Sequence, residues 1–102
     1  MSIYTLTNVR QILQVKPAEL PALDLADEDV LLLQDDKRVL ATNLHKALTL
    51  GKSGGKTDIT FETKAGSRRV EIPVIAYDDK YVWLEGNYKL PLRCIRSVDF
   101  YK

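Results

Sequence analysis

One set of side chains in the C-terminal half has the types and spacing of a binding surface, because aromatic rings and cations alternate there with apolar residues. Six of them share the strand face opposite the apolar series, as does Ile75: Arg69, Tyr77, Tyr81, Trp83, Lys89 and Arg93. Surfaces that bind single-stranded nucleic acid combine rings that stack on bases with cations that neutralise phosphates. An amphipathic helix or a protein partner could equally cover this candidate binding face.

The chain has one histidine, His45, and one cysteine, Cys94. A catalytic Cys–His pair needs the two within hydrogen-bond reach and a third group to orient the imidazole, and nothing in their spacing provides this. Two such residues also fall short of the four ligands of a usual zinc site. We therefore expect no catalytic residue, no metal and no cofactor, and predict that the protein is not an enzyme.

Two other motifs have structural explanations. The adjacent carboxylates Asp35-Asp36 and Asp78-Asp79 fall in predicted caps or turns. The sequence Gly51-Lys52-Ser53 resembles the end of a phosphate-binding loop, but Lys46 stands where that motif needs its first glycine. We interpret residues 51–56 as a flexible loop.

Length and composition predict a single domain over residues 1–102. The hydrophobic content of 45% and charged content of 28% are ordinary for a globular protein. A formal net charge of +1 creates no general attraction for nucleic acid or membranes. Residues 1–50 carry five basic and seven acidic side chains, whereas residues 51–102 carry ten and seven, which favours an acidic partner for the second half.

The single cysteine excludes an intramolecular disulfide, and we expect no leader peptide at the start of the chain. The apolar run Val30–Leu33 is far shorter than the roughly 20 residues of a membrane-spanning helix. We therefore expect no membrane span and a reducing, cytoplasmic location.

Residues 1–50 are predicted to be mainly helical, with the principal helix at about 36–49. Apolar residues recur there at spacings of three and four, and Gly51 follows as a stop signal: Val39, Leu40, Leu44, Ala47 and Leu48. Earlier segments leave alternatives open. Thr7–Val15 fits a short helix or a strand, and two prolines predict a linker at 16–25 with at most one helical turn. Residues 27–33 fit the start of a helix, or a strand followed by a turn at 34–37.

Residues 57–101 show the period-two alternation of β-strands. The expected strands are 57–64, 68–77, 80–85, 88–92 and 97–101. Gly86-Asn87 suits the positive φ angles of a two-residue hairpin, and Pro73 predicts a bend in the second strand. With a helical turn expected at 93–97, these elements predict a five-stranded antiparallel SH3-like β-barrel.

Three segments of the chain are LHKALTLG at 44–51, TDITFETKAGSRRVE at 57–71 and KYVWLEGNYKLPLRCIRSVDF at 80–100. Together they resemble a group of short uncharacterised bacterial proteins. The resemblance covers residues 44–100 and implies one helix followed by an SH3-like barrel. It implies no activity, and no catalytic residue is carried over.

The sequence thus predicts an α+β protein with a non-enzymatic binding or scaffolding role, acting through protein interaction or self-association. The alternative is a small nucleic-acid-binding barrel that uses the candidate binding face. Exposure of Trp83 beside Lys89 and Arg93 would favour the alternative, whereas burial of Trp83 beneath the helix would remove its stacking platform.

Overall fold

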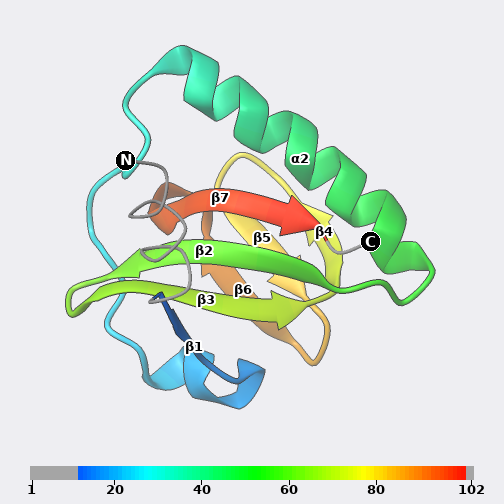
Figure 1. Ribbon diagram of the computed structural model, residues 1–102, viewed down its shortest axis with the longest axis horizontal. Helices are drawn as coiled ribbons and strands as arrows, with labels where there is room; N and C mark the ends of the chain where they lie inside the picture. The colour runs from blue at the N-terminus through cyan, green and yellow to red at the C-terminus, as the bar shows by residue number, and fades with distance from the viewer. Residues whose placement is uncertain (1–11, 101–102) are drawn as a thin grey trace, which may run out of the picture.

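A long helix, α2, lies across one side of two small β-sheets in the computed structural model, which describes residues 12–100 (Figure 1). The elements in chain order are β1 (Leu13–Gln14), η1 (Pro17–Ala22), α2 (Gln34–Lys52), β2 (Thr57–Thr63), β3 (Gly66–Ile72), β4 (Val74–Tyr77), β5 (Tyr81–Leu84), β6 (Tyr88–Pro91), η2 (Leu92–Cys94) and β7 (Ile95–Phe100). The α+β class is confirmed, with one main helix. The two η elements are short 3-10 helices, and η2 forms the turn expected before the last strand.

The first sheet has the strand order β1-β3-β2-β7. β2 runs antiparallel to β3 and β7, whereas the two-residue β1 runs parallel to β3. Ile59 lies opposite Val70 on one side and Val98 on the other, and all three are buried. The alternation in this sheet therefore directs one face into the core.

The second sheet is an antiparallel meander of β4, β5 and β6. Val82 lies opposite Leu90, and both are fully buried on its inner face. At the turn between β5 and β6, Gly86 and Asn87 have φ angles of 88° and 67°. The predicted use of positive φ at this hairpin is confirmed.

The strand predicted at 68–77 is divided at Pro73 into β3 and β4, which belong to different sheets. Proline has no amide hydrogen to donate to a ladder, so the continuous pairing ends there and the chain bends. The described residues contain seven strands rather than the predicted five, and the two sheets do not close into a barrel. The other additional strand is β1, which lies outside the predicted barrel but matches the strand alternative for residues 7–15.

Helix α2 is longer than the predicted 36–49 and begins without a side-chain cap at Leu33. Leu40, Leu44 and Ala47 form its buried stripe, as expected from their spacing. The prediction that Val39 belongs to the same stripe is wrong, because its side chain is 59% exposed. Neither α2 nor any other helix within residues 12–100 has the length and apolar character needed to cross a membrane.

The helix lies against one edge strand of each sheet, β7 and β4 (Figure 1). Asn43 Nδ2 donates a hydrogen bond to the Val98 carbonyl of β7, at 3.3 Å. Near the other end of α2, a Cβ on Gly51 would lie 2.1 Å from the Val74 carbonyl oxygen of β4. Only glycine permits that approach, so α2 bridges the gap between the two sheets.

Residues 12–33 follow the outside of the sheets with little regular structure. Residues 1–11 lie outside the described residues; within the predicted segment Thr7–Val15, Leu13–Gln14 adopt the strand alternative. The predicted linker holds η1, whose six residues make about two turns of 3-10 helix, so the expectation of at most one helical turn is wrong. Residues 27–33 form neither a helix nor a strand, so both alternatives for them are wrong.

One hydrophobic cluster joins the helix, both sheets and the N-terminal segment. It consists of Val15, Leu20, Leu40, Leu44, Ala47, Ile59, Phe61, Val70, Ile72, Val74, Val82, Leu84, Leu90, Cys94, Ile95 and Val98. Val15 and Leu20 anchor the N-terminal segment to the same core as the strands. The elements around this core therefore hold the surfaces described next in fixed relation.

Candidate functional site

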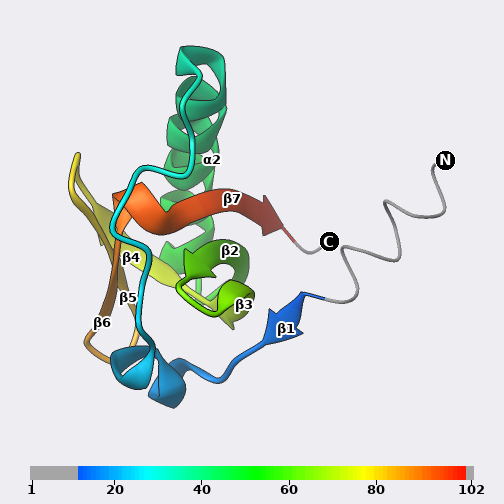
Figure 2. The same cartoon turned by 90° about the vertical axis from the view of Figure 1, so that its left-hand side faces the viewer.

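The outer face of the three-stranded sheet carries aromatic, apolar and basic side chains. We call it the strand face, and it consists of Ile75, Ala76, Tyr81, Trp83 and Lys89. Trp83 of β5 lies opposite Ala76 of β4 and Lys89 of β6. β4 to β6 form the left flank of the molecule in Figure 2, with α2, β2, β3 and β7 to their right.

Backbone pairing explains why three of these side chains meet. The Leu92 amide donates to the Lys80 carbonyl, so the alternation along β5 and β6 makes Trp83 and Lys89 a non-hydrogen-bonded pair, in which side chains approach closely. Lys89 Nζ lies 4.4 Å from the centre of the Tyr81 ring, a cation–π contact. The Tyr81 and Trp83 ring centres are 5.9 Å apart with the planes tilted by 55°.

Helix α2 does not account for the half-buried state of Trp83. The helix packs chiefly on β4 and β7, and its buried residues belong to the core cluster. Trp83 is not part of that cluster and lies on the opposite side of the sheet from the buried Val82. The strand face therefore retains an accessible ring.

The six residues predicted for the candidate binding face are only partly brought together. Tyr77 lies opposite Val82 and packs against the core, because a bulge between Val74 and Ala76 reverses the alternation before it. Arg69 lies on the other sheet, where its guanidinium contacts Asp58 at 2.8 Å. The remaining four residues border one continuous surface: Tyr81, Trp83, Lys89 and Arg93. Tyr81 connects them, because it belongs to the strand face and also lines a neighbouring groove, described next, whose lining includes Arg93.

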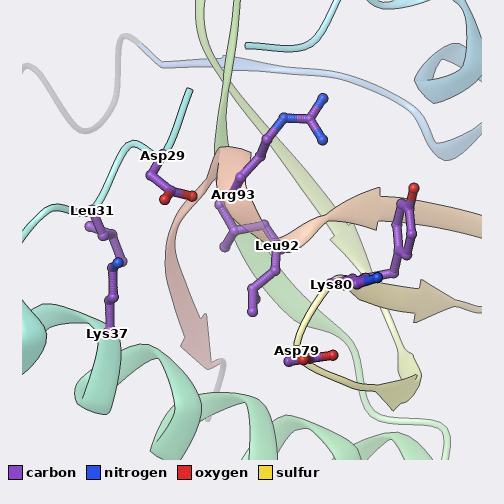
Figure 3. Close-up of a pocket in the computed structure, with 9 residues that line it drawn as sticks. Asp29, Leu31, Lys37, Asp79, Lys80, Leu92 and Arg93 are labelled. Carbon is purple, nitrogen blue, oxygen red and sulfur yellow. The ribbon is translucent and has the colours of Figure 1, made fainter. Parts of the chain in front are cut away.

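A groove of about 460 Å³ adjoins the strand face, and its walls come from four separate segments (Figure 3). It is lined by Asp29, Leu31, Lys37, Asp79, Lys80, Tyr81, Leu92, Arg93 and Ile95. The wall formed by residues 29–31 is tied to η2 by two hydrogen bonds. The Val30 amide donates to the Arg93 carbonyl at 3.0 Å, and Arg93 Nε donates to the Ala26 carbonyl at 3.0 Å.

The opposite wall is the turn between β4 and β5. Asp78 Oδ1 accepts hydrogen bonds from the backbone amides of Tyr81 and Lys80, both at 2.8 Å. These bonds favour the charged carboxylate and lower the pKa of Asp78 below its ordinary value. The turn is thereby held in one conformation, which fixes the backbone of Asp79 and Lys80 at the rim.

The groove combines an apolar floor with unpaired charges. The accessible apolar part of the lining, which we call the floor, is Leu31 and Leu92, whereas Ile95 is fully buried. The rim holds three cations and two carboxylates: Lys37, Lys80, Arg93, Asp29 and Asp79. None of these five takes part in any of the ion pairs found within residues 12–100. Elsewhere, Lys64, Arg69 and Arg96 each contact a carboxylate. The rim charges are thus available to an outside partner.

Strongly exposed leucines lie beside the groove, and the sequence analysis missed them. The side chains of Leu32 and Leu33, which precede α2, are 80% and 66% exposed. Together with Val39 they make three of the six exposed large hydrophobic residues in the described part of the chain. The signal in the sequence was the apolar run Val30–Leu33, which lies between two acidic clusters. Its residues show neither the apolar spacing of a helix nor the alternation of a strand.

The lone cysteine and histidine lie in different environments. Cys94 is buried, and its thiol donates to the Pro91 carbonyl at 3.1 Å. Burial raises the pKa of this thiol to about 11, so the nucleophilic thiolate is scarce at neutral pH. His45 lies exposed on α2. Within residues 12–100, no group of three or more His, Cys, Asp or Glu side chains is placed to hold a metal ion.

No family model, curated protein or solved structure matches this chain.

Proposed function

We propose that the protein is a non-enzymatic interaction module that binds a protein segment in the groove and along the adjoining strand face. The mixed charge of the groove carries this proposal: three cations and two carboxylates without ion pairs surround an apolar floor. A protein segment offers both signs of charge together with apolar side chains. Tyr81, Trp83 and Arg93 are also of the residue types that contribute most to binding at protein interfaces.

The non-enzymatic part of the proposal is supported by the state of the candidate chemical groups. A buried, protonated Cys94 and a solvent-exposed His45 provide no activated nucleophile with its base. The acidic pair Asp78-Asp79 is explained by its turn, because Asp78 accepts two backbone hydrogen bonds there.

We also propose that the connectivity from β2 to β7 is that of an SH3-like barrel. The β2–β3 hairpin, the bend at Pro73, the β4–β6 meander and the short η2 turn follow in the order expected for that fold. The pairing of β7 with β2, the last strand with the first of this unit, supports the same assignment. In this proposal α2 occupies the side on which β4 and β7 are not paired with each other.

Nucleic-acid binding is the second candidate, and the position of Trp83 outside the helix-covered core favours it. Two observations weigh against it. Lys89 already lies over the Tyr81 ring, and Asp29 and Asp79 would repel phosphates beside the cations. The net charge of +1 provides no compensating attraction.

A peptide-display selection against the full chain tests the protein-binding proposal. Selected peptides should bind the wild type, and Tyr81→Ala or Leu92→Ala should weaken binding by about tenfold or more, because both side chains line the groove. His45→Gln on the solvent face of α2 is the control and should leave binding unchanged. Equal binding to all four proteins would show that the groove is not the site.

Fluorescence anisotropy with a labelled random oligonucleotide separates the two candidates. We expect weak or no binding at physiological salt. Submicromolar binding that weakens with salt at a log–log slope of about 0.7 per phosphate contact, and that is lost on Trp83→Ala, would instead establish the nucleic-acid candidate.

A further inference from the structure

The segment that forms one wall of the groove has the chemistry that the groove itself would bind. Its exposed side chains include Leu32 and Leu33, and Asp35 and Asp36, which follow after Gln34, are acidic. The groove offers an apolar floor, and Lys80 lies beside Asp79 on the wall opposite this segment, whereas Arg93 is hydrogen-bonded to the segment itself through Val30 and Ala26. The exposed leucines and Asp36 on one side of the patch thus complement the apolar floor and Lys80 on the other.

We propose that a second copy of this chain occupies the groove, in a twofold-symmetric dimer. This inference rests on the proposed function and names its partner. In a twofold interface the same patch serves both copies, so it must be self-complementary. Here Leu32 and Leu33 of each copy lie in the groove of the other, and Asp36 in the first turn of α2 meets Lys80 of the other copy.

Charge pairing selects the residues that meet. Asp35 already contacts Arg38 of its own helix at 3.6 Å, whereas Asp36 has no ion pair within residues 12–100. Lys80 is exposed and also lacks an ion pair, while Arg93 is partly engaged by the Ala26 carbonyl. The dimer therefore places Asp36 of one copy opposite Lys80 of the other, twice by symmetry.

The exposure of the leucines supports an occupant that buries them. Leu32 is the most exposed of the large hydrophobic residues, at 80%, and no element within residues 12–100 covers it. Contact with the partly exposed groove residues Leu31 and Leu92 would remove apolar surface of both copies from water. Ile75 of the strand face does not line the groove, so this 53% exposed side chain serves as a matched control.

Sedimentation velocity over a concentration series tests the dimer. The wild type should associate, and the double variant Leu32→Ser, Leu33→Ser should weaken association by about tenfold or more, because both anchors are lost. Ile75→Ser should associate like the wild type. A monomeric wild type at every accessible concentration, or a dimer insensitive to the double leucine variant, would overturn the proposal.

A charge exchange tests the pairing separately. Lys80→Glu alone and Asp36→Lys alone should each weaken self-association. An equimolar mixture of the two should form a mixed dimer, since each of its two contacts then joins opposite charges. Lys46→Glu, on the exposed part of α2, is the control and should have no effect. Failure of the mixture to associate better than either variant would refute the assigned pairing.

These outcomes are distinguishable from failure of the proposed function. Display-selected peptides that require Tyr81 and Leu92, bound by a chain that remains monomeric, would overturn the second-copy inference and keep the proposed function. A chain that binds no peptide and remains monomeric would overturn both.

Discussion

The four-stranded sheet and the groove use their charged side chains in opposite ways. On the sheet, Arg69 contacts Asp58 and Arg96 contacts Glu62, at 2.8 and 3.0 Å, and in each pair the carboxylate is mostly buried. At the groove, three cations and two carboxylates lie within one small region and form no ion pair with any residue of the described segment 12–100. The difference is that the sheet pairs its charges within the fold, whereas the groove leaves its charges without an ion pair in the described residues, as the proposed binding requires.

Apolar side chains also differ between the two regions, because those of the sheets and α2 are buried and those beside the groove are exposed. The sheets and α2 bury Leu44 to 1% exposure, whereas the segment before α2 leaves Leu32 and Leu33 in solvent. A surface that is apolar, charged and unpaired contributes little to folding. Substitutions should therefore separate the two regions, with losses of stability on the sheet side and losses of binding on the groove side.

The largest effect is expected at the junction of α2 with the sheets. Leu44→Ala removes a fully buried side chain and should lower the free energy of unfolding by about 2–5 kcal/mol, a large share of the 5–15 kcal/mol of a typical domain. The Val39 side chain on the same helix is exposed, so Val39→Ala should change the free energy of unfolding by less than about 0.5 kcal/mol. Urea denaturation followed by circular dichroism measures both. An unchanged urea midpoint for Leu44→Ala would show that α2 does not contribute to the core.

A smaller effect contrasts a paired cation with a groove cation. Arg69→Met leaves the carboxylate of Asp58 without its 2.8 Å partner and should cost about 1–3 kcal/mol. Lys80→Met should change stability by less than about 0.5 kcal/mol, because Lys80 has no ion pair in the described structure. Equal losses in the same denaturation assay would erase the distinction between the two regions.

The smallest effect is a pH dependence at η2, where the two regions meet. The folded-state pKa of Cys94, about 11, lies above its ordinary value of 9.0 because the thiol is buried. A raised pKa means that the folded state holds the proton more tightly than the unfolded state. The contribution of the thiol to the free energy of unfolding is therefore present below pH 9 and is lost as the pH rises toward 11.

Thermal melts of the wild type and Cys94→Ala across this pH range test the assignment. The difference in melting temperature between the two proteins should shift against the wild type above pH 9. A difference that stays constant with pH would show that the thiol does not titrate with folding. The second check is reaction of the thiol with a disulfide reagent, which should be slow in the native state and fast in urea.

Much of the fold could be predicted because its signals are local. The spacing of Leu40, Leu44 and Ala47 specifies the buried stripe of α2, and Gly86-Asn87 specifies the β5–β6 turn. Pro73 marked the bend, but the division of strands between two sheets depends on pairing across the molecule. The sequence alone therefore overestimated the continuity of the second strand.

The candidate site was less predictable, for two physical reasons. One extra residue at the β4 bulge reverses the alternation, so Tyr77 turns inward although its parity matches Trp83. The groove draws residues from four segments far apart in the chain, and its wall at 29–31 has no periodicity. Only tertiary structure places Asp29 near Arg93 or Lys37 near Leu92.

The position of α2 also bears on how this protein would aggregate. β4 and β7 are end strands whose free edges could each accept a strand from another molecule, and α2 lies against both. Detachment of the helix alone would uncover two such edges at once while most of the sheet structure remained intact. Variants that loosen α2, such as Leu44→Ala, should therefore form insoluble material before their strands unfold, and the shelf life of the protein should depend on helix docking more than on overall stability.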